Sequence, residues 1–383
     1  MRGTLRGMTP DDLALLRLIG CGGASAPRRR LLERHPGPCA ALAAGHGAWR
    51  EAGLDDGQRR ALGAPDTLPP AWTAWLEHPR HRLLGWHDPD YPALLRRATN
   101  PPLALFVAGD ADLLWHPAVA VVGTRAPTAA GREHARDFAT AFARAGLAVC
   151  SGLAAGIDTA AHHASLEAGG ITVAVLGSGI DVPYPRANAG LHRAIVERGA
   201  VVSEHPPGTG ARREHFPARN RIIAGLALGS LVIEAAQRSG ALITARLAAE
   251  AGREVFALPG SVRNPMARGC HRLLREGASL VEGPAEVAAA LAPVAATLAD
   301  ALRQRLLAPI PLCADATHGS AGGAAPEDPD YQRLWSALCH DPSPMDQLLE
   351  RTGLTTAEVS SMLLLMELDG RVVHEHGRYS RKS

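Results

Sequence analysis

Short apolar runs alternate with helical stretches from residue 85 to about 290, and this alternation restricts the fold more than any other feature. The runs are apolar almost throughout, as expected of strands that are covered on both faces. Such strand–helix–strand units predict a parallel sheet in a three-layer, Rossmann-like α/β fold. The expected strands lie at 118–122, 147–150, 171–176, 200–203, 230–234, 254–258 and 279–281, and the expected helices at 130–145, 157–168, 187–198, 218–228 and 240–251.

Helical periodicity also fills the region before this core. We expect an N-terminal helical domain at 1–80, with a glycine turn at 20–23 between its first two helices. Such a turn is typical of a SAM or helix-hairpin-helix-like unit, whose turn amides can hold a phosphate. The alternative is a small helical bundle in which the glycines cap helix ends.

After the core domain, placed at 81–300, the composition changes again. Residues 301–330 become rich in proline, alanine, glycine and acidic residues, which predicts a linker. Residues 331–383 are predicted to form a winged-helix-like domain. Its expected elements are helices at 331–340, 344–352 and 355–369, a strand at 372–374 and a second strand at Tyr379.

The overall charge excludes a strongly cationic nucleic-acid coat, because 40 basic and 38 acidic side chains leave a net charge of +2. Among the basic residues the only lysine is Lys382. A Walker A loop needs a lysine on the phosphates, and a Schiff-base enzyme needs a buried lysine amine. Both classes are therefore excluded.

The cysteines and the hydropathy pattern predict a cytoplasmic protein. The six cysteines are scattered without a C-x-x-C pair, which argues against a zinc ribbon and suits a reducing compartment. The N-terminal segment turns acidic before any apolar stretch, unlike a signal peptide. The longest weakly polar run, 222–236, contains Glu234 and is too short to span a bilayer, so no membrane insertion is expected.

Candidate binding residues follow from where the strands end. In open α/β sheets, ligands bind beyond the carboxyl ends of the strands. Glycine turns that lead into helices offer free amides to an anion there, and a nearby arginine adds a forked donor. The alternative for each loop is a tight turn with a solvated arginine. The candidates in three such loops are Gly123, Thr124 and Arg125; Ser178, Gly179 and Arg186; and Ser239 and Gly240.

The strongest candidate segment surrounds Phe216. Residues 205–275 hold 11 arginines and four glutamates, a net +7, so the rest of the chain carries −5. A basic groove with an aromatic ring for stacking is how single-stranded nucleic acid is held. The alternative is a solvated loop with Phe216 in the core. The basic residues nearest to Phe216 are Arg212, Arg213, Arg219 and Arg221, with Asn220 between the last two.

Catalytic motifs are not found in the sequence. Asp158 and His162 stand four residues apart at the start of an expected helix, which permits a metal-ligand or acid–base pair. Without a third ligand in sight, we favour Asp158 serving the helix N-terminus and His162 packing beneath the loop. The chain also lacks a G-x-S-x-G elbow, an H-E-x-x-H helix and a P-loop. We expect no catalytic residue, no cofactor and no metal.

Together these motifs resemble those of the DNA-processing protein A family, DprA or Smf. The matching stretches lie in order between residues 121 and 282, and FPARNRIIAG with SGALITA is the most specific combination. The family signature Gly-Ser-Arg corresponds to Gly123-Thr124-Arg125, so the hydroxyl is retained. Arg186 stands where the family often has lysine, so the charge is retained. The other stretches are VVGTRAPTAAG, SGLAAGIDTAAHHASLEAGG, VAVLGSGIDVPYP, VIEAAQRSGALITARLAAEAGREVFALPG and GCHRLLREGASLVE.

The resemblance implies a cytoplasmic single-stranded DNA-binding protein without established catalytic activity. Such a protein protects DNA imported during natural transformation and loads RecA on strands covered by single-strand-binding protein. It also implies a homodimer formed through the Rossmann-like domain. The implied pocket comprises Arg125, Arg186, Phe216, Arg219, Asn220 and Arg221, with Arg213 beside them.

Two other classes of protein are weighed against this one. Rossmann-like nucleotide phosphoribohydrolases share a glycine-rich phosphate pocket, but their P-G-G-x-G-T-x-x-E loop is not found here. A DNA-binding regulator would act through the winged helix. Its expected recognition helix, 355–369, has no basic residue and carries Glu358, Glu367 and Asp369, which suits a major groove poorly.

Overall fold

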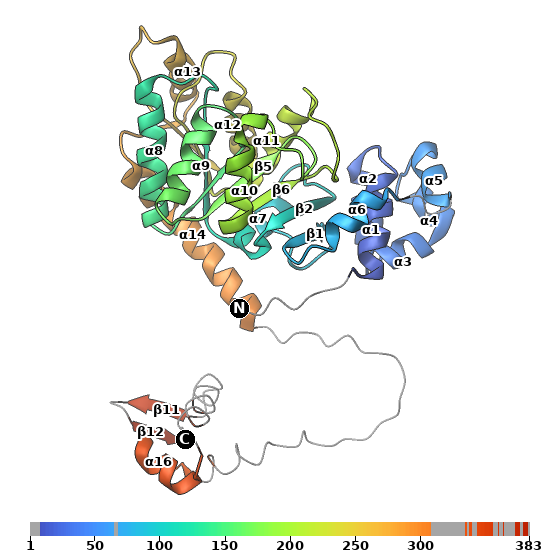
Figure 1. Ribbon diagram of the computed structural model, residues 1–383, viewed down its shortest axis with the longest axis vertical. Coiled ribbons are helices and arrows are strands. Elements are labelled where there is room, and N and C mark those ends of the chain that lie inside the picture. Colours follow the sequence, from blue (N-terminus) through green and yellow to red (C-terminus); the bar gives the residue numbers. More distant parts are fainter. Residues whose placement is uncertain are drawn as a thin grey trace. The chain divides into compact units, whose positions relative to one another are not determined.

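A computed structural model shows the chain as two compact units, Met1–Ala308 and Pro309–Ser383 (Figure 1). Each unit is considered by itself. No helix in the described part of the chain is both long and apolar enough to cross a membrane. The structure describes residues 8–64, 68–307, 334, 337–338, 343–354, 359, 363, 372–375 and 378–381.

A nine-stranded sheet organises the first unit, in the order β1-β2-β6-β5-β4-β3-β7-β8-β9. From β6 to β9 all neighbours are parallel, whereas β2 runs antiparallel to both β1 and β6. The parallel core confirms the predicted fold class. The strands are β1 (His81–Gly85), β2 (Ala104–Gly109), β3 (Ala118–Val122), β4 (Ala148–Ser151), β5 (Thr172–Leu176), β6 (Ala200–Ser203), β7 (Gly229–Val232), β8 (Glu254–Ala257) and β9 (Ser279–Leu280).

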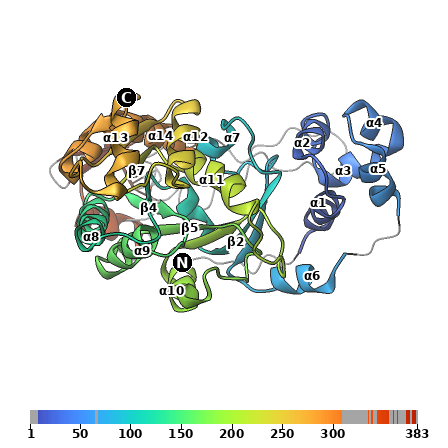
Figure 2. The ribbon, with the colours of Figure 1, turned by 90° about the horizontal axis from the view of Figure 1, so that it is seen from above.

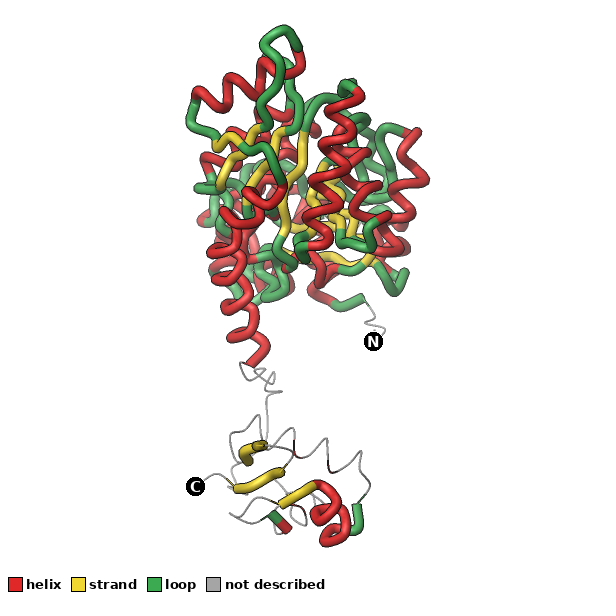
Figure 3. The backbone as a smooth tube through the Cα atoms, turned by 90° about the vertical axis from the view of Figure 1, so that its left-hand side faces the viewer, coloured by secondary structure: helices red, strands yellow, loops and turns green. Residues whose placement is uncertain are grey.

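Helices cover both faces of this sheet (Figures 2 and 3). The hydrophobic clusters place α8, α9, α10 and α14 on one face and α7, α11, α12 and α13 on the other. Figure 2 shows the strands between α8, α9 and α10 on one side and α11, α12 and α13 on the other. The helices are α7 (Ala93–Arg96), α8 (Ala129–Arg144), α9 (Ile157–Glu167), α10 (Ala189–Arg198), α11 (His215–Leu226), α12 (Ala241–Glu250), α13 (Arg268–Arg275) and α14 (Pro284–Leu307).

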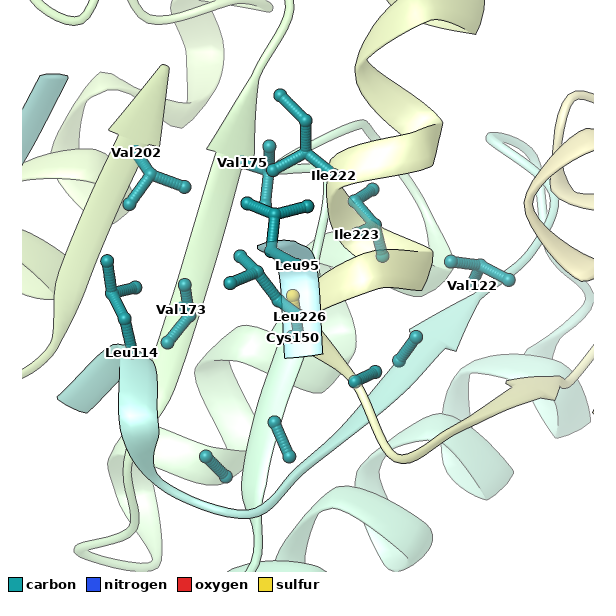
Figure 4. Close-up of a cluster of buried hydrophobic side chains, with 14 of the residues drawn as sticks. Leu95, Leu114, Val122, Cys150, Val173, Val175, Val202, Ile222, Ile223 and Leu226 are labelled. Carbon is teal, nitrogen blue, oxygen red and sulfur yellow. The ribbon is translucent and has the colours of Figure 1, made fainter. Parts of the chain in front are cut away.

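Burial on both faces explains why the strands are apolar throughout. In β5, Val173 and Val175 pack against the α11 face, whereas Ala174 and Leu176 belong to the cluster on the α10 face. Figure 4 shows the first of these clusters, where strand side chains meet those of α11. Residues that point to either face of the strand are therefore buried in the core, as predicted. The labelled members are Leu95, Leu114, Val122, Cys150, Val173, Val175, Val202, Ile222, Ile223 and Leu226.

The N-terminal helices pack in the same unit as the sheet, and their cluster includes Leu83 of β1 and Phe106 of β2. The carbonyl oxygens of the glycine turn between α1 and α2 accept hydrogen bonds from two side chains of this helical region. Buried Arg28 donates to the Gly23 carbonyl at 2.8 Å, and Gln58 donates to the Gly22 carbonyl at 2.8 Å. The helices are α1 (Pro10–Gly20), α2 (Ser25–Glu33), α3 (Pro38–Ala43), α4 (Gly45–Glu51), α5 (Asp56–Gly63) and α6 (Pro70–Leu76).

Several elements differ from the sequence prediction. Strands β1 and β2 and helices α7, α13 and α14 were not expected. Helix α14 continues through residues 301–307, which the sequence analysis assigned to the linker. Helix α11 begins at His215 rather than at 218, because Pro217 lies within its first turn, where its missing amide hydrogen costs no helical bond.

The described part of the second unit contains a three-stranded antiparallel sheet and one helix of eight residues, about two turns. The sheet order is β10-β12-β11. Helix α16 (Met345–Thr352) matches the expected helix at 344–352. Most of the other two expected helices, 331–340 and 355–369, lies outside the described residues. The strands are β10 (Ser343–Pro344), β11 (Val372–Glu375) and β12 (Arg378–Arg381).

Candidate nucleic-acid interface

The carboxyl ends of the parallel strands bring three distant segments together around Phe216. The ring of Phe216, in the first turn of α11, is half-buried. The Arg125 guanidinium carbon, from the loop after β3, lies 5.6 Å from the ring centroid. The Tyr184 ring, from the loop after β5, lies 5.2 Å away at an interplanar angle of 44°. Two aromatic rings and a guanidinium therefore form one cluster at this edge of the sheet.

Arg125 is held at the surface by the turn that precedes it. A side chain at Gly123 would collide with Ile157 of α9, so only glycine allows this close approach. Thr124 donates its amide hydrogen to the Glu234 carbonyl at 2.7 Å, and its hydroxyl accepts from the Ala126 amide at 3.2 Å. Gly123 and Thr124 thus fix the turn, and exposed Arg125 is its cationic group.

The loop after β5 contains residues that are hydrogen-bonded within the protein and one exposed arginine. Ser178 is buried and donates its hydroxyl hydrogen to the Val182 carbonyl at 2.6 Å. Gly179 donates its amide hydrogen to the Thr209 carbonyl at 2.7 Å. These two groups are engaged within the protein, so they do not form the anion cradle expected from the Gly-Ser-Gly pattern. Arg186 lies exposed and makes no ion pair within the described residues.

Arg219 lies beneath the interface rather than on it. Its side chain is only 6% exposed, and its guanidinium donates to the carbonyls of Gly152, at 2.6 Å, and Val175. The carboxylate of buried Asp158 accepts from the Gly152 amide at 3.1 Å, so Gly152 contacts both charged side chains, one through its carbonyl and the other through its amide. Burial raises the pKa of Asp158, and the Arg219 charge opposes that rise. Arg219 therefore supports the strand ends.

The other predicted residues, in α11 and just before α12, also make contacts within the protein. Arg221 forms an ion pair with Glu204 at 2.6 Å. Asn220 is buried and donates to the Gly240 carbonyl at 3.3 Å. The Ser239 hydroxyl accepts from the Ala241 amide at 3.2 Å, which occupies the group expected to face an anion. Gly240 itself is exposed.

The exposed members of the predicted set are consequently few. Arg125 and Arg186 face outward from the loops after β3 and β5, and Arg213 is exposed just before α11. Phe216 joins the first two loops through its ring contacts. Tyr184 was not predicted from the sequence, although aromatic residues are only 4% of the chain and this one lies between a strand end and Arg186.

Asp158 and His162 form neither a metal site nor an acid–base pair. Asp158 accepts from the Gly152 and Ala154 amides before α9, at 3.1 and 3.3 Å. His162 is fully buried, its Nδ1 lies 2.6 Å from the Thr172 hydroxyl, and burial lowers its pKa to about 3. Among the described residues, no group of three potential ligands could hold a metal ion.

The fold and this surface define a class: a Rossmann-like protein that presents arginines and aromatic rings at the carboxyl ends of its parallel strands. Comparison with known proteins narrows the class to a family. The family model for DNA recombination-mediator protein A matches residues 82–292, and the model for the DprA winged helix domain matches residues 319–378. The chain therefore belongs to the DprA (Smf) family, and its C-terminal unit carries the predicted winged helix.

Individual relatives agree with this assignment. Protein Smf of Escherichia coli is 40% identical over 80% of this chain and 79% of its own length. The structure of DNA processing protein A from Streptococcus pneumoniae aligns with a TM-score of 0.64 at 37% identity, covering 74% of this chain and 98% of that one. The Helicobacter pylori protein, studied for its single-stranded DNA binding mode, aligns with a TM-score of 0.50 at 26% identity, covering 59% and 97%.

Membership in this family also decides between the classes considered from the sequence. DprA proteins process and bind DNA and are not known enzymes. The phosphoribohydrolase alternative is therefore set aside, in agreement with the missing P-G-G-x-G-T-x-x-E loop.

Proposed function

We propose that this protein binds single-stranded DNA along the carboxyl-terminal edge of its sheet. The observation that carries the proposal is the cluster in which Phe216 contacts Arg125 and Tyr184 at an exposed edge. Stacking on aromatic rings needs unpaired bases, and arginines beside the rings hold the phosphates. The Helicobacter pylori relative, described for its single-stranded DNA binding mode, supports this choice of ligand.

Within this proposal the predicted residues have two roles. Arg125, Arg186 and Arg213 are the exposed cations that contact phosphates. Phe216 belongs to the stacking surface. The remaining predicted residues hold the loops in place from beneath, through the contacts described above: Gly123, Thr124, Ser178, Gly179, Arg219, Asn220, Arg221, Ser239 and Gly240.

We further propose that the bound strand passes to RecA during natural transformation, on DNA covered by single-strand-binding protein. The family description as a recombination mediator supports this step. We place the activity in the cytoplasm, in a homodimer formed through the Rossmann-like domain. The cysteines of the first unit are all free, which suits a reducing compartment.

The first experiment compares single-stranded with duplex DNA of equal length over a salt series. We expect tighter binding to the single strand. Each of Arg125→Ala, Arg186→Ala and Arg213→Ala should weaken binding at every sequence and flatten the log–log salt dependence by about 0.7 for each phosphate that is no longer neutralised. Arg136→Ala is the matched control, because Arg136 is exposed on α8 and pairs with Glu167 at 3.0 Å. Equal affinity for duplex and single strand would contradict the proposal.

The second experiment tests the transfer to RecA. Purified RecA filaments form slowly on DNA covered by single-strand-binding protein, so the readout is the lag before RecA-dependent ATP hydrolysis begins. Wild-type protein should shorten the lag, and Arg125→Ala should shorten it less. An unchanged lag with protein that binds single-stranded DNA would refute the RecA step and leave the binding proposal standing.

A further inference from the structure

Tyr184 is the exposed aromatic ring of the interface. Its side chain is 46% exposed, whereas Phe216 is half-buried. It is also the only aromatic residue among the exposed large hydrophobic side chains of the described chain. Exposing a large apolar ring forgoes the free energy that burial would provide. This cost is offset where the ring meets a ligand.

Phe216 is covered by its own neighbours. Its Cδ1 atom would lie 3.0 Å from a Cβ atom at position 177, so the backbone of Gly177 packs closely against the ring. The Arg125 guanidinium lies over the same ring at 5.6 Å, and the Tyr184 ring contacts it at 5.2 Å. Little of Phe216 is therefore open to an incoming base.

The spacing of the two rings also excludes insertion between them. Stacked rings keep about 3.5 Å between their planes, so a base between two rings needs roughly 7 Å. The centroids of Tyr184 and Phe216 are only 5.2 Å apart. With 46% of its side chain exposed, Tyr184 offers more open aromatic surface than half-buried Phe216. Arg186, two residues further along, supplies an exposed cation beside it.

The geometry points to Tyr184 as the residue on which a DNA base stacks, with Phe216 behind it as its support. This inference rests on the proposed single-stranded DNA binding and deepens it. It assigns base contact mainly to the loop after β5, and it gives Phe216 the role of holding the Tyr184 ring in place. A base on Tyr184 then lies beside a phosphate on Arg186.

The test measures affinity and salt dependence with two probes. One probe is an oligothymidylate and the other is an abasic strand of the same length, which keeps the phosphates and removes the bases. Tyr184→Ala should bind the oligothymidylate about 5- to 150-fold more weakly, the range expected for one stacked base. Its affinity for the abasic strand and its salt slope should stay unchanged, because no charge is removed.

Two variants serve as controls. Tyr184→Phe keeps the ring and should bind both probes like wild type. Val294→Ala removes an exposed apolar side chain, 39% exposed, from helix α14, and should also bind like wild type. Because Tyr184 is exposed, its alanine variant should unfold at the same denaturant concentration as wild type.

The outcomes separate this inference from the proposed function. If wild type prefers single strands and Tyr184→Ala binds like wild type while Phe216→Ala binds weakly, then Phe216 is the stacking surface and the inference is wrong. If Tyr184→Ala loses as much affinity for the abasic strand as for the oligothymidylate, the ring acts on the backbone contacts and the inference is again wrong. If wild type shows no preference for single strands, both proposals fall together.

Discussion

Replacing Arg219 by methionine removes a guanidinium from beneath the strand ends while keeping most of the side-chain volume. Arg219 donates to the Gly152 carbonyl at 2.6 Å, and the Gly152 amide donates to Asp158 at 3.1 Å. Arg219 and Asp158 are both buried, with exposed fractions of 6% each. The variant therefore leaves the Asp158 carboxylate buried without its opposing charge. Because Arg219 contacts the Gly152 and Val175 carbonyls rather than Asp158 directly, we expect a loss of about 1–3 kcal/mol, the cost of leaving a buried polar group unsatisfied.

The sign of the pH dependence follows from the pKa of Asp158. Burial raises this pKa, and the Arg219 charge opposes the rise, so the pKa should increase further in Arg219→Met. Between the ordinary aspartate pKa of about 3.9 and the raised folded value, the native state holds a proton that the unfolded chain has released. The free energy of unfolding of the variant should therefore fall as pH rises through this window. The destabilisation should be smaller near about pH 4 than near about pH 7.

The assay is denaturant unfolding of wild type and variant at both pH values, followed by circular dichroism. Asp158→Asn in the Arg219→Met background should recover part of the lost stability, because it removes the uncompensated charge. Arg186→Met is the matched control and should stay within about 0.5 kcal/mol of wild type, since Arg186 is exposed. An Arg219→Met protein as stable as wild type, with a flatter salt dependence of DNA binding, would show that Arg219 contacts phosphate as the sequence suggested.

Three further changes test the loops around the interface. Gly152→Ala would place a methyl group against the Arg219 guanidinium, so denaturant titration should show a loss of about 1–3 kcal/mol. Thr128→Ala removes the hydroxyl that accepts from the Gly131 amide at 3.0 Å and caps α8, and the melting temperature should fall with a loss of about 0.5–2 kcal/mol. Burial lowers the pKa of His205 from 6.5 to about 4, so the unfolded chain binds the proton first and stability falls as pH drops through that range. His205→Gln should lose less stability there, and an identical pH profile would contradict this assignment.

The parallel strands could be predicted because their hydrophobicity comes from burial on both faces, which is a local signal. Strand β2 carries the same signal, because five of its six residues are buried, yet it was not predicted. What the sequence does not give is the antiparallel pairing of β2 with β6, nearly a hundred residues further along, where Phe106 lies opposite Ser203. Contacts of that range are not encoded in a window of neighbouring residues.

The position of the interface could also be predicted from the sequence, whereas the orientation of its side chains could not. Strand ends locate the loops, so Arg125, Arg186 and Phe216 could be named. Which side chains face outward depends on the helix face and on loop packing. Arg219 and Arg221 stand two positions apart, about 200° around a helix, so they cannot share a face. One lies beneath the sheet edge and the other pairs with Glu204.

The difference between exposed arginines and buried or paired ones also bears on how residues 205–275 bind DNA. The net +7 of residues 205–275 counts every arginine equally. Yet Arg219 is buried beside Asp158, Arg221 pairs with Glu204, and Arg272 pairs with Glu276 at 2.7 Å. If every excess charge of this segment met a phosphate, together with Arg125 and Arg186 from outside it, the salt slope for a single strand would be about −6, whereas these two arginines and Arg213 alone give about −2. A slope near the smaller value would mean that most of the local positive charge does not contact phosphates, and that the aromatic rings supply the rest of the affinity.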